Sequence, residues 1–217
     1  MKIFKRLDLN PKNINLYYTA FTHSSYCNEN PSVSDYERLE FLGDAVLELI
    51  ISDYLYKERH LEEGKMTKMR ATYVCESACA TYARDLKFMD DIKMGNSEEE
   101  ANETILADVF EAFIGAMYLD LGFEEAKRIV LDIILKYINK NINFLKDYKS
   151  ELQELVQTVK KSVTYEVIKE EGPSHNKTFT CVAIVDGIKM GTGIGSSKKN
   201  AEQEAARQAL SKRAEIK

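Results

Sequence analysis

The chain contains 217 residues, 44% of them hydrophobic, and carries a net charge of −5. This composition provides a sizeable core and allows one or two domains. No run of about 18 apolar residues occurs and the charged start MKIFKRLDLN is unlike a secretory signal, so we expect no membrane-spanning helix and no membrane partner. Four cysteines without a paired C-x-x-C spacing argue against zinc and predict reduced thiols in a cytoplasmic protein.

Charge is distributed unevenly along the chain. Residues 1–145 contain 17 Lys and Arg against 25 Asp and Glu, a net charge of −8, whereas residues 146–217 contain 13 against 10, a net charge of +3. Such asymmetry is expected when one domain holds metal ions and the other follows phosphates, although a charge of +3 is also common in proteins that bind no nucleic acid. We place the boundary near Lys146, which predicts domains at 1–145 and 147–215.

The predicted elements begin with a short helix from Leu16 to Thr22, and Asn28 to Asp35 forms a loop. Between them stands the segment His23-Ser24-Ser25-Tyr26, in which we interpret His23 as a structural hydrogen-bonding residue.

The next segment, ERLEFLGDAVLE at residues 37–48, predicts an amphipathic helix with a purely acidic stripe. Four acids fall within an arc of about 80° on such a helix: Glu37, Glu40, Asp44 and Glu48. The opposite, inward side contains Leu39, Leu42, Val46, Leu49 and Ile50. Like charges three and four residues apart repel, and no Lys or Arg lies on the stripe. Phe41 lies among the acids. An ordinary solvated helix face is the simplest explanation of the stripe alone.

After the acidic helix, Leu61 to Lys65 predicts a turn, and Thr67 to Leu86 predicts a continued helical pattern. The polar segment Met94 to Glu103 follows, and we interpret its run of acids as solvated.

The segment ILADVFEAFIGAMYL at residues 105–119 contains only two charged residues, Asp108 and Glu111, three apart on one face. A helix this apolar is buried nearly all round, and buried carboxylates are rare unless paired or bound to metal. No Lys or Arg occurs between Glu103 and Lys127, although a distant one could still neutralise the acids. Together with the first stripe, this pattern predicts a divalent-cation site with oxygen ligands from Glu40, Asp44, Asp108 and Glu111. Another amphipathic helix, Glu124 to Ile142, ends this part of the chain.

The C-terminal part has a different pattern. The elements predicted there are a helix at Ser150 to Val159, strands at Thr164 to Ile168, Phe179 to Val185 and Lys189 to Ile194, and a helix at Lys198 to Leu210. Asp186-Gly187 is a hairpin signal, and Ser197 is a helix cap. The alanines of the last helix permit close packing on the sheet. The prediction is an all-α N-terminal domain followed by a small α+β domain of order α-β-β-β-α.

Several of these segments resemble a known family. ERLEFLGDAVLELI and ILADVFEAFIGAMYLDLG resemble the two acidic segments of the ribonuclease III family, and the likeness extends from about Leu16 to Leu210. DYKSELQELVQ, GPSHNKTF and GSSKKNAEQEAA resemble the three contact segments of a double-stranded-RNA-binding domain. The resemblance implies an N-terminal endonuclease domain that hydrolyses phosphodiester bonds in double-stranded RNA. It further implies a homodimer that makes staggered cuts with 5′-phosphate and 3′-hydroxyl ends, in rRNA and mRNA processing. The segment Met94 to Glu103 departs from the family, which has a longer sequence bearing glycine and arginine there.

The resemblance also assigns roles to residues of the first domain. It implies that Glu40, Asp44, Asp108 and Glu111 bind Mg²⁺, with Mn²⁺ able to substitute and no organic cofactor. We rank Asp44 and Glu111 first as catalytic ligands. Glu37, Phe41 and Glu63 match positions near the substrate or the subunit interface. Phe41 would be an apolar knob that fills a socket on the other subunit, whereas for Glu63, as for Arg70, an ordinary helix-end charge or a surface salt bridge explains the residue equally well.

The residues that would bind RNA lie in the second domain: Gln153, Gln157, Ser174, His175, Lys198 and Lys199. Double-stranded RNA is recognised through phosphates and 2′-hydroxyls, because its deep major groove hides the bases. Gln153 and Gln157 stand one helical turn apart and can reach 2′-hydroxyls. Two lysines in the first turn of a helix oppose the helix dipole and therefore need an anion, which a phosphate would supply. Solubilising surface charge is the alternative explanation, which the surrounding motif makes the less favoured of the two.

Two other functions are compatible with parts of the pattern. A protein that binds duplex RNA without cutting it would have no reason to keep Asp108 and Glu111 in so apolar a helix. A helical-bundle carboxylate enzyme with iron or manganese needs Glu-x-x-His pairs. Gly43 and Ile114 stand three residues after Glu40 and Glu111, so this second alternative lacks its ligands.

Overall fold

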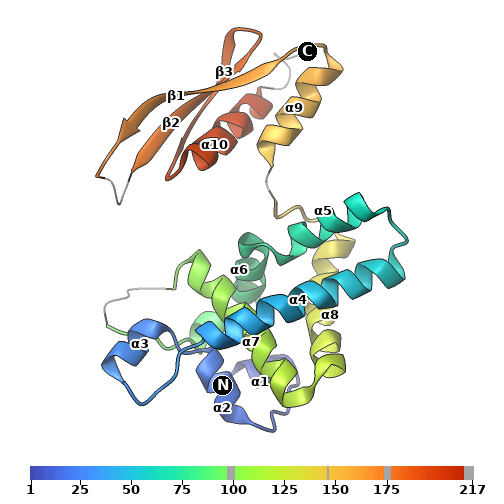
Figure 1. Cartoon of the computed structure of the whole chain (residues 1–217), viewed down its shortest axis with the longest axis vertical. Coiled ribbons are helices and arrows are strands. Elements are labelled where there is room, and N and C mark those ends of the chain that lie inside the picture. Colours follow the sequence, from blue (N-terminus) through green and yellow to red (C-terminus); the bar gives the residue numbers. More distant parts are fainter. Residues whose placement is uncertain (97–100, 146, 174–176, 213–217) are drawn as a thin grey trace. The chain divides into compact units, whose positions relative to one another are not determined.

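The computed structural model describes residues 1–96, 101–145, 147–173 and 177–212. The chain divides into two compact units, Met1–Leu145 and Lys146–Lys217, each with its own hydrophobic core. The first unit is helical, and the second contains a helix, three strands and a helix, so the predicted fold class is confirmed (Figure 1). Within the described ranges, the helices are too short or too polar to cross a bilayer.

The described part of the first unit contains α1 (Ile3–Arg6), α2 (Ile14–Ala20), α3 (Ser24–Glu29), α4 (Glu37–Glu58), α5 (Glu63–Val74), α6 (Glu76–Asp85), the 3-10 turn η1 (Phe88–Asp90), α7 (Glu103–Leu121) and α8 (Phe123–Asn139). Helix α7 lies at the centre, in contact with α2, α4, α6 and α8. The Asn102 side chain caps its start, and Gly122 ends it with a positive φ of 85°. Its ring at Phe113 packs against Tyr17 and Phe21 at α2 and against Phe88 of η1.

The single helical pattern predicted from Thr67 to Leu86 is wrong. The chain turns a corner at Cys75, whose backbone is extended (φ −72°, ψ 159°), and this residue separates α5 from α6. The corner lets Tyr73 and Tyr82 both reach the core, where the Tyr82 hydroxyl donates a hydrogen bond to the Tyr73 carbonyl at 3.2 Å. Periodicity alone did not reveal this, because both helices present apolar residues on either side of the corner.

Helices α4 and α7 cross in backbone contact. A Cβ atom added to Gly43 would lie 1.7 Å from the Glu111 carbonyl oxygen, and one added to Gly115 would lie 2.3 Å from the Leu39 carbonyl oxygen. Two glycines therefore allow these helices to approach more closely than any side chain would permit. The approach sets residues 40 and 44 of one helix beside residues 108 and 111 of the other.

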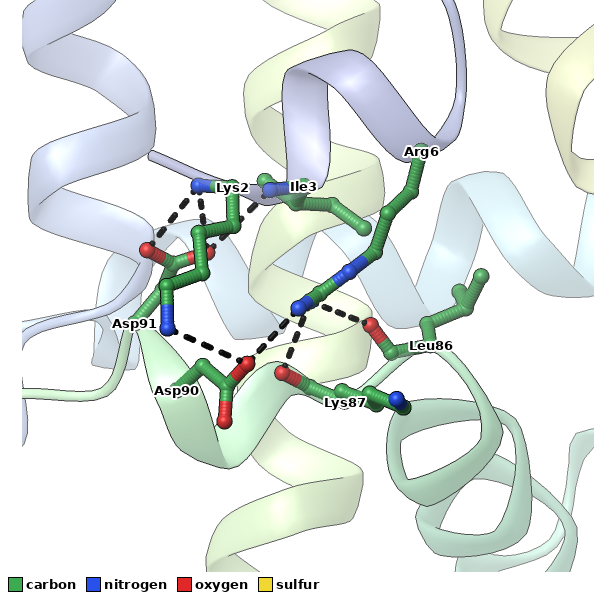
Figure 2. Close-up of polar contacts among 7 residues, drawn as sticks. All are labelled: Lys2, Ile3, Arg6, Leu86, Lys87, Asp90 and Asp91. Carbon is green, nitrogen blue, oxygen red and sulfur yellow. Dashed lines mark hydrogen bonds and ion pairs between the residues drawn. The ribbon is translucent and has the colours of Figure 1, made fainter.

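Two aspartates tie the N-terminal segment to the chain that follows α6 (Figure 2). Asp91 accepts hydrogen bonds from the backbone N–H groups of Lys2 and Ile3, at 3.0 Å and 3.2 Å for the same carboxylate oxygen. Asp90 accepts one from Arg6 at 2.7 Å, and the same guanidinium also donates to two backbone carbonyls after α6. These contacts hold the buried side chain of Ile3 against the core beneath α7.

The second unit contains α9 (Tyr148–Thr158), β1 (Val163–Glu171), β2 (Thr178–Val185), β3 (Ile188–Gly195) and α10 (Lys198–Ser211). The strands form an antiparallel sheet in the order β1-β2-β3, and both helices pack on one of its faces. A Cβ at Gly193 would lie 2.2 Å from the Ala201 carbonyl oxygen, so small residues on both sides permit the close approach of α10. Strand β1 runs three residues beyond its predicted end, because pairing with β2 resumes after an irregularity between Val167 and Lys169.

The α4–α7 crossing generates a stability prediction. Replacing Gly43 with alanine should lower the free energy of unfolding by about 3 kcal/mol, because the new methyl group collides with backbone that cannot move without separating the helices. The matched control is Gly64→Ala in α5, where nothing lies within 4 Å of the added atom. That change should stabilise the protein by about 0.5–1 kcal/mol, since alanine favours a helix. Urea unfolding measures both; equal, small effects would contradict the close crossing.

Candidate functional site

Four carboxylates gather where α4 and α7 cross. Glu40 and Asp44 flank Gly43 on α4, and Asp108 and Glu111 stand one turn apart on α7. Asp44 is exposed, and the other three are half-buried. The structure therefore brings together the four acids that the sequence pattern associates with a metal site.

The electrostatics of the four acids reflect crowding of like charge. Burial, and then the negative charges of Asp44, Glu40 and Asp108, raise the pKa of Glu111 to about 8. Burial, and then Asp108, Glu37 and Asp44, raise the pKa of Glu40 to about 6. Burial also raises the pKa of Asp108. Deprotonating all four at neutral pH therefore costs free energy unless a positive charge joins them.

Among the described residues, no Lys or Arg supplies that charge, and His23 lowers the pKa of Asp108 only against the larger, opposite effect of burial. None of the ion pairs in this part of the chain involves Glu40, Asp44, Asp108 or Glu111. Lys127, the first basic residue after α7, binds Asp53 on α4 instead. A distant Lys or Arg was the main alternative for the buried acids, and the described residues contain no such partner.

The donor set fits a hard divalent cation. Mg²⁺ prefers carboxylate oxygens, and four carboxylates from two helices supply a negative charge that no Lys or Arg in the described chain pairs with. No three Asp, Glu, His or Cys side chains in the described ranges already converge as ligands on one point. The fit therefore rests on donor chemistry and on uncompensated charge, and not on a closed coordination shell.

Tyr36 contributes to this site and was not anticipated from the sequence. It lies just before α4, is buried, and its hydroxyl donates a hydrogen bond to an Asp108 carboxylate oxygen at 3.1 Å. The ring of His23 stands 5.8 Å from the Tyr36 ring, and the His23 Nδ1 caps α3 by accepting from the Ser25 N–H at 3.2 Å. His23 thus has the structural role predicted for it. The sequence signal for Tyr36 was its position directly before the acidic segment.

Cys79 also reaches the acids without having been predicted to do so. Its side chain on α6 is fully buried near Glu111, and burial, followed by that carboxylate, raises the pKa of the thiol well above its ordinary value. The thiol therefore remains protonated and uncharged next to the carboxylate. The four cysteines are free, and the periodicity of the sequence gave no indication that α6 would bring Cys79 to this place.

The exposed side of α4 carries an apolar stripe beside the acids. Phe41 is 83% exposed, as expected for a residue predicted to lie among charges. Leu49, which we predicted to point inward, is instead 54% exposed, and Tyr56 is 75% exposed. The three positions fall within an arc of about 80° on the helix. The prediction for Leu49 was wrong because α4 buries only the narrow face that contacts α7, α5 and α8.

Glu37 and Glu63 occupy different surroundings. Glu37 is exposed in the first turn of α4, and its charge contributes to the raised pKa of Glu40. Glu63 begins α5, accepts a hydrogen bond from the Thr67 hydroxyl at 2.9 Å, and lines a small pocket with Arg70. In the described part of the chain, no hydrogen bond or ion pair joins Glu63 to the acids at the crossing.

The predicted RNA-binding residues lie on two helices of the second unit. Gln153 and Gln157 are exposed on α9, one turn apart. Lys198 and Lys199 are exposed in the first turn of α10, whose start the Ser197 hydroxyl caps. The remaining predicted contacts, at residues 174 and 175, lie outside the described residues.

Fold and site together define a helical domain with four acids at the crossing of two helices, followed in the chain by an α-β-β-β-α domain. A family model described as Ribonuclease-III-like matches residues 13–138, and one described as a double-stranded RNA binding motif matches residues 148–213. The chain belongs to the ribonuclease III family, and its second domain is a double-stranded-RNA-binding domain.

Full-length relatives support this assignment. The chain is 45% identical over 214 residues to Ribonuclease 3 of Onion yellows phytoplasma, covering 97% of this chain and 90% of that protein. It is 46% identical over 210 residues to Ribonuclease 3 of Listeria monocytogenes, covering 93% and 92%. Among solved structures, the nuclease domain of ribonuclease III from Campylobacter jejuni aligns with a TM-score of 0.58 and 41% identity, covering 62% of this chain and 95% of that domain. That structure is described as showing flexibility in the region involved in dimer formation.

The raised pKa of Glu111 predicts how stability depends on pH. Because the folded protein holds this proton up to about pH 8 and the unfolded chain releases it near 4.5, stability is lost as pH rises between those values. In the presence of a chelator, Glu111→Gln should therefore gain stability relative to the wild type from pH 5 to 8, by on the order of 1–3 kcal/mol. Urea midpoints at several pH values measure the difference.

The control for this experiment is Glu125→Gln. Arg128 lowers the pKa of this exposed carboxyl, so its removal should not stabilise the protein at pH 8. Adding Mg²⁺ should stabilise the wild type more than Glu111→Gln, since only the wild type retains all four acids. If the stability difference between Glu111→Gln and the wild type does not change with pH, the folded protein does not raise the pKa of Glu111.

Proposed function

We propose that this protein is an endoribonuclease that hydrolyses phosphodiester bonds of double-stranded RNA with divalent metal ions. It acts in the cytoplasm as a homodimer and makes staggered cuts with 5′-phosphate and 3′-hydroxyl ends, in rRNA and mRNA processing. The observation that carries the proposal is the group of four carboxylates at the α4–α7 crossing, which have no Lys or Arg partner among the described residues, in a chain of this family that also contains an RNA-binding domain. Mg²⁺ is the metal proposed, with Mn²⁺ as a substitute.

The four acids would have different roles in binding the metal ion. Burial and three neighbouring carboxylates raise the pKa of Glu111, so this residue gains from a bound cation, whereas Asp44 is exposed and accessible to an incoming ion; we rank these two first as ligands. Tyr36 holds one oxygen of Asp108 and leaves the other available. When bound, Mg²⁺ would supply Lewis-acid stabilisation of charge on the phosphodiester oxygens and lower the pKa of a water molecule.

Two features support the homodimer. The first is the apolar stripe on α4, formed by Phe41, Leu49 and Tyr56, because large exposed apolar side chains in a row mark an interaction surface. The second is a pocket of about 700 Å³ at the start of the same helix, lined by Leu16, Thr19, Ser34, Asp35, Arg38, Leu39, Leu42 and Leu119. Its apolar lining suits an aromatic ring. In a two-fold dimer, Phe41 of each copy would enter the pocket of the other.

The second domain supplies affinity for the duplex. Its exposed amides on α9 suit 2′-hydroxyls across a minor groove, and its lysines on α10 suit phosphates. The same helix also presents backbone N–H groups at its start, which favour anions. Binding through shape and backbone would leave the choice of the cut bond to the acidic site of the first domain.

Replacing Glu111 with glutamine tests the nuclease proposal directly. The amide keeps the shape of the side chain but removes a ligand charge, so cleavage of a perfect RNA duplex should fall by several orders of magnitude. Binding to the duplex should stay close to normal, because the second domain is untouched. Glu124→Gln, an exposed acid at the start of α8, is the control and should cleave normally. Gel analysis of labelled duplex measures both, and undiminished cleavage by Glu111→Gln would remove this residue from the mechanism.

Replacing Phe41 with alanine tests the dimer. Loss of a ring that fills a pocket should weaken association by about 2 kcal/mol, or roughly thirtyfold in Kd, which shifts the protein toward monomer at low concentration. Met89→Ala is the control, since this residue is also exposed but lies in η1, outside the stripe. Sedimentation velocity over a dilution series measures the shift. A dimer equally stable in both variants would rule out the proposed knob.

A further inference from the structure

Glu170 connects two basic residues of the RNA-binding domain. Its carboxylate lies 2.8 Å from the Lys198 ammonium at the start of α10 and 3.7 Å from the Lys177 ammonium just before β2. The Lys198 ammonium also lies 5.7 Å from the centre of the Phe179 ring. Lys198 is thus held between a carboxylate and an aromatic face, although it belongs to the proposed RNA contacts.

The position of Glu170 follows from the extra length of β1. Pairing of β1 with β2 resumes after the irregularity at Val167 and Lys169, and it aligns Glu170 with Phe179. Had β1 ended at Ile168, as the sequence pattern predicted, the sheet would not place Glu170 beside Phe179, whose ring Lys198 contacts. The ion pair therefore depends on the register of the sheet.

The start of α10 needs an anion for physical reasons. Its first turn contains Lys198 and Lys199 and no acid, so two positive charges stand at the positive end of the helix dipole. Glu170 supplies a negative charge there from the neighbouring strand. Lys198 in turn lowers the pKa of this carboxyl, which keeps it ionised.

We propose that Glu170 is an internal substitute for an RNA phosphate. In the free protein it neutralises Lys198, and a phosphate of the duplex displaces it when RNA binds. This inference rests on the proposed binding of duplex RNA through the start of α10. It assigns Glu170 the role of lowering affinity for RNA, because each binding event must first break the pair with Lys198.

The solvent exposure of Lys198 and Glu170 limits how strongly their ion pair can change the affinity for RNA. The side chains of Lys198 and Glu170 are 59% and 40% exposed, and exposed pairs of this kind contribute little. Glu170→Gln should therefore bind duplex RNA about two- to fivefold more tightly than the wild type. The slope of log affinity against log salt concentration should become steeper by up to about 1. Without Glu170, one more lysine is free to neutralise a phosphate, and this releases a counterion from the phosphate backbone.

The test uses the full chain in a chelator, which prevents metal-dependent cleavage, and fluorescence anisotropy with a labelled RNA duplex. The matched control is Glu171→Gln, which removes the same charge from the next residue, where the carboxylate pairs with Lys169 at 2.8 Å. Its effect on affinity should be clearly smaller than that of Glu170→Gln. Equal effects would mean that only overall charge matters, and would overturn the proposal.

A double variant isolates the pair. Lys198→Ala should weaken binding, and adding Glu170→Gln to it should no longer tighten binding, because the displaced contact is gone. If the wild type does not bind the duplex, the proposed function fails. If the wild type binds but Glu170→Gln binds equally or more weakly, or Lys198→Ala has no effect, only the present inference fails.

Discussion

The backbone contact between α4 and α7 is the constraint on which the active part of the molecule depends. Gly43 and Gly115 remove the side chains that would separate the helices, and the acids on either side of the crossing are then forced together. Burial, and then their mutual repulsion, raise the pKa values of Glu40 and Glu111. Burial of the apolar face of α7 outweighs this cost, because each large side chain buried there contributes about 1.5–3 kcal/mol. Packing thus imposes an electrostatic arrangement that the acids alone would avoid.

Much of this arrangement could be predicted from the sequence, because its signals are local. The central helix is apolar on nearly all sides, so its two acids stood out, and the strands of the second domain are rich in β-branched and aromatic residues. The fold class followed from these patterns and is confirmed. Local sequence patterns do not show which segments lie close together in the folded protein. Tyr36 and Asp108 are 72 residues apart in sequence, and their hydrogen bond depends on how α4 docks on α7.

The wrong predictions have a common physical origin. The corner at Cys75 and the exposed position of Leu49 are both decided by tertiary packing, which overrides the helical period of the residues involved. Leu49 has the hydrophobicity of a core residue, but it faces away from α7 and extends the stripe that begins at Phe41. The extra length of β1, which brings Glu170 to α10, is likewise a property of strand pairing. None of these could be read from one segment alone.

Charged side chains of like sign lie together in both domains, but they differ in burial and therefore in the partner that balances them. Glu111 is half-buried at a helix crossing, where water screens its neighbours poorly and no described basic residue balances it, so a strongly charged ion is the partner that suits it. Lys198 is exposed, so water and salt already weaken its field, and a single carboxylate from Glu170 balances it. A partner that compensates a buried charge is held tightly, whereas one that compensates an exposed charge exchanges readily. The acidic crossing therefore suits a metal held through many reactions, and the start of α10 suits a phosphate that must leave after each one.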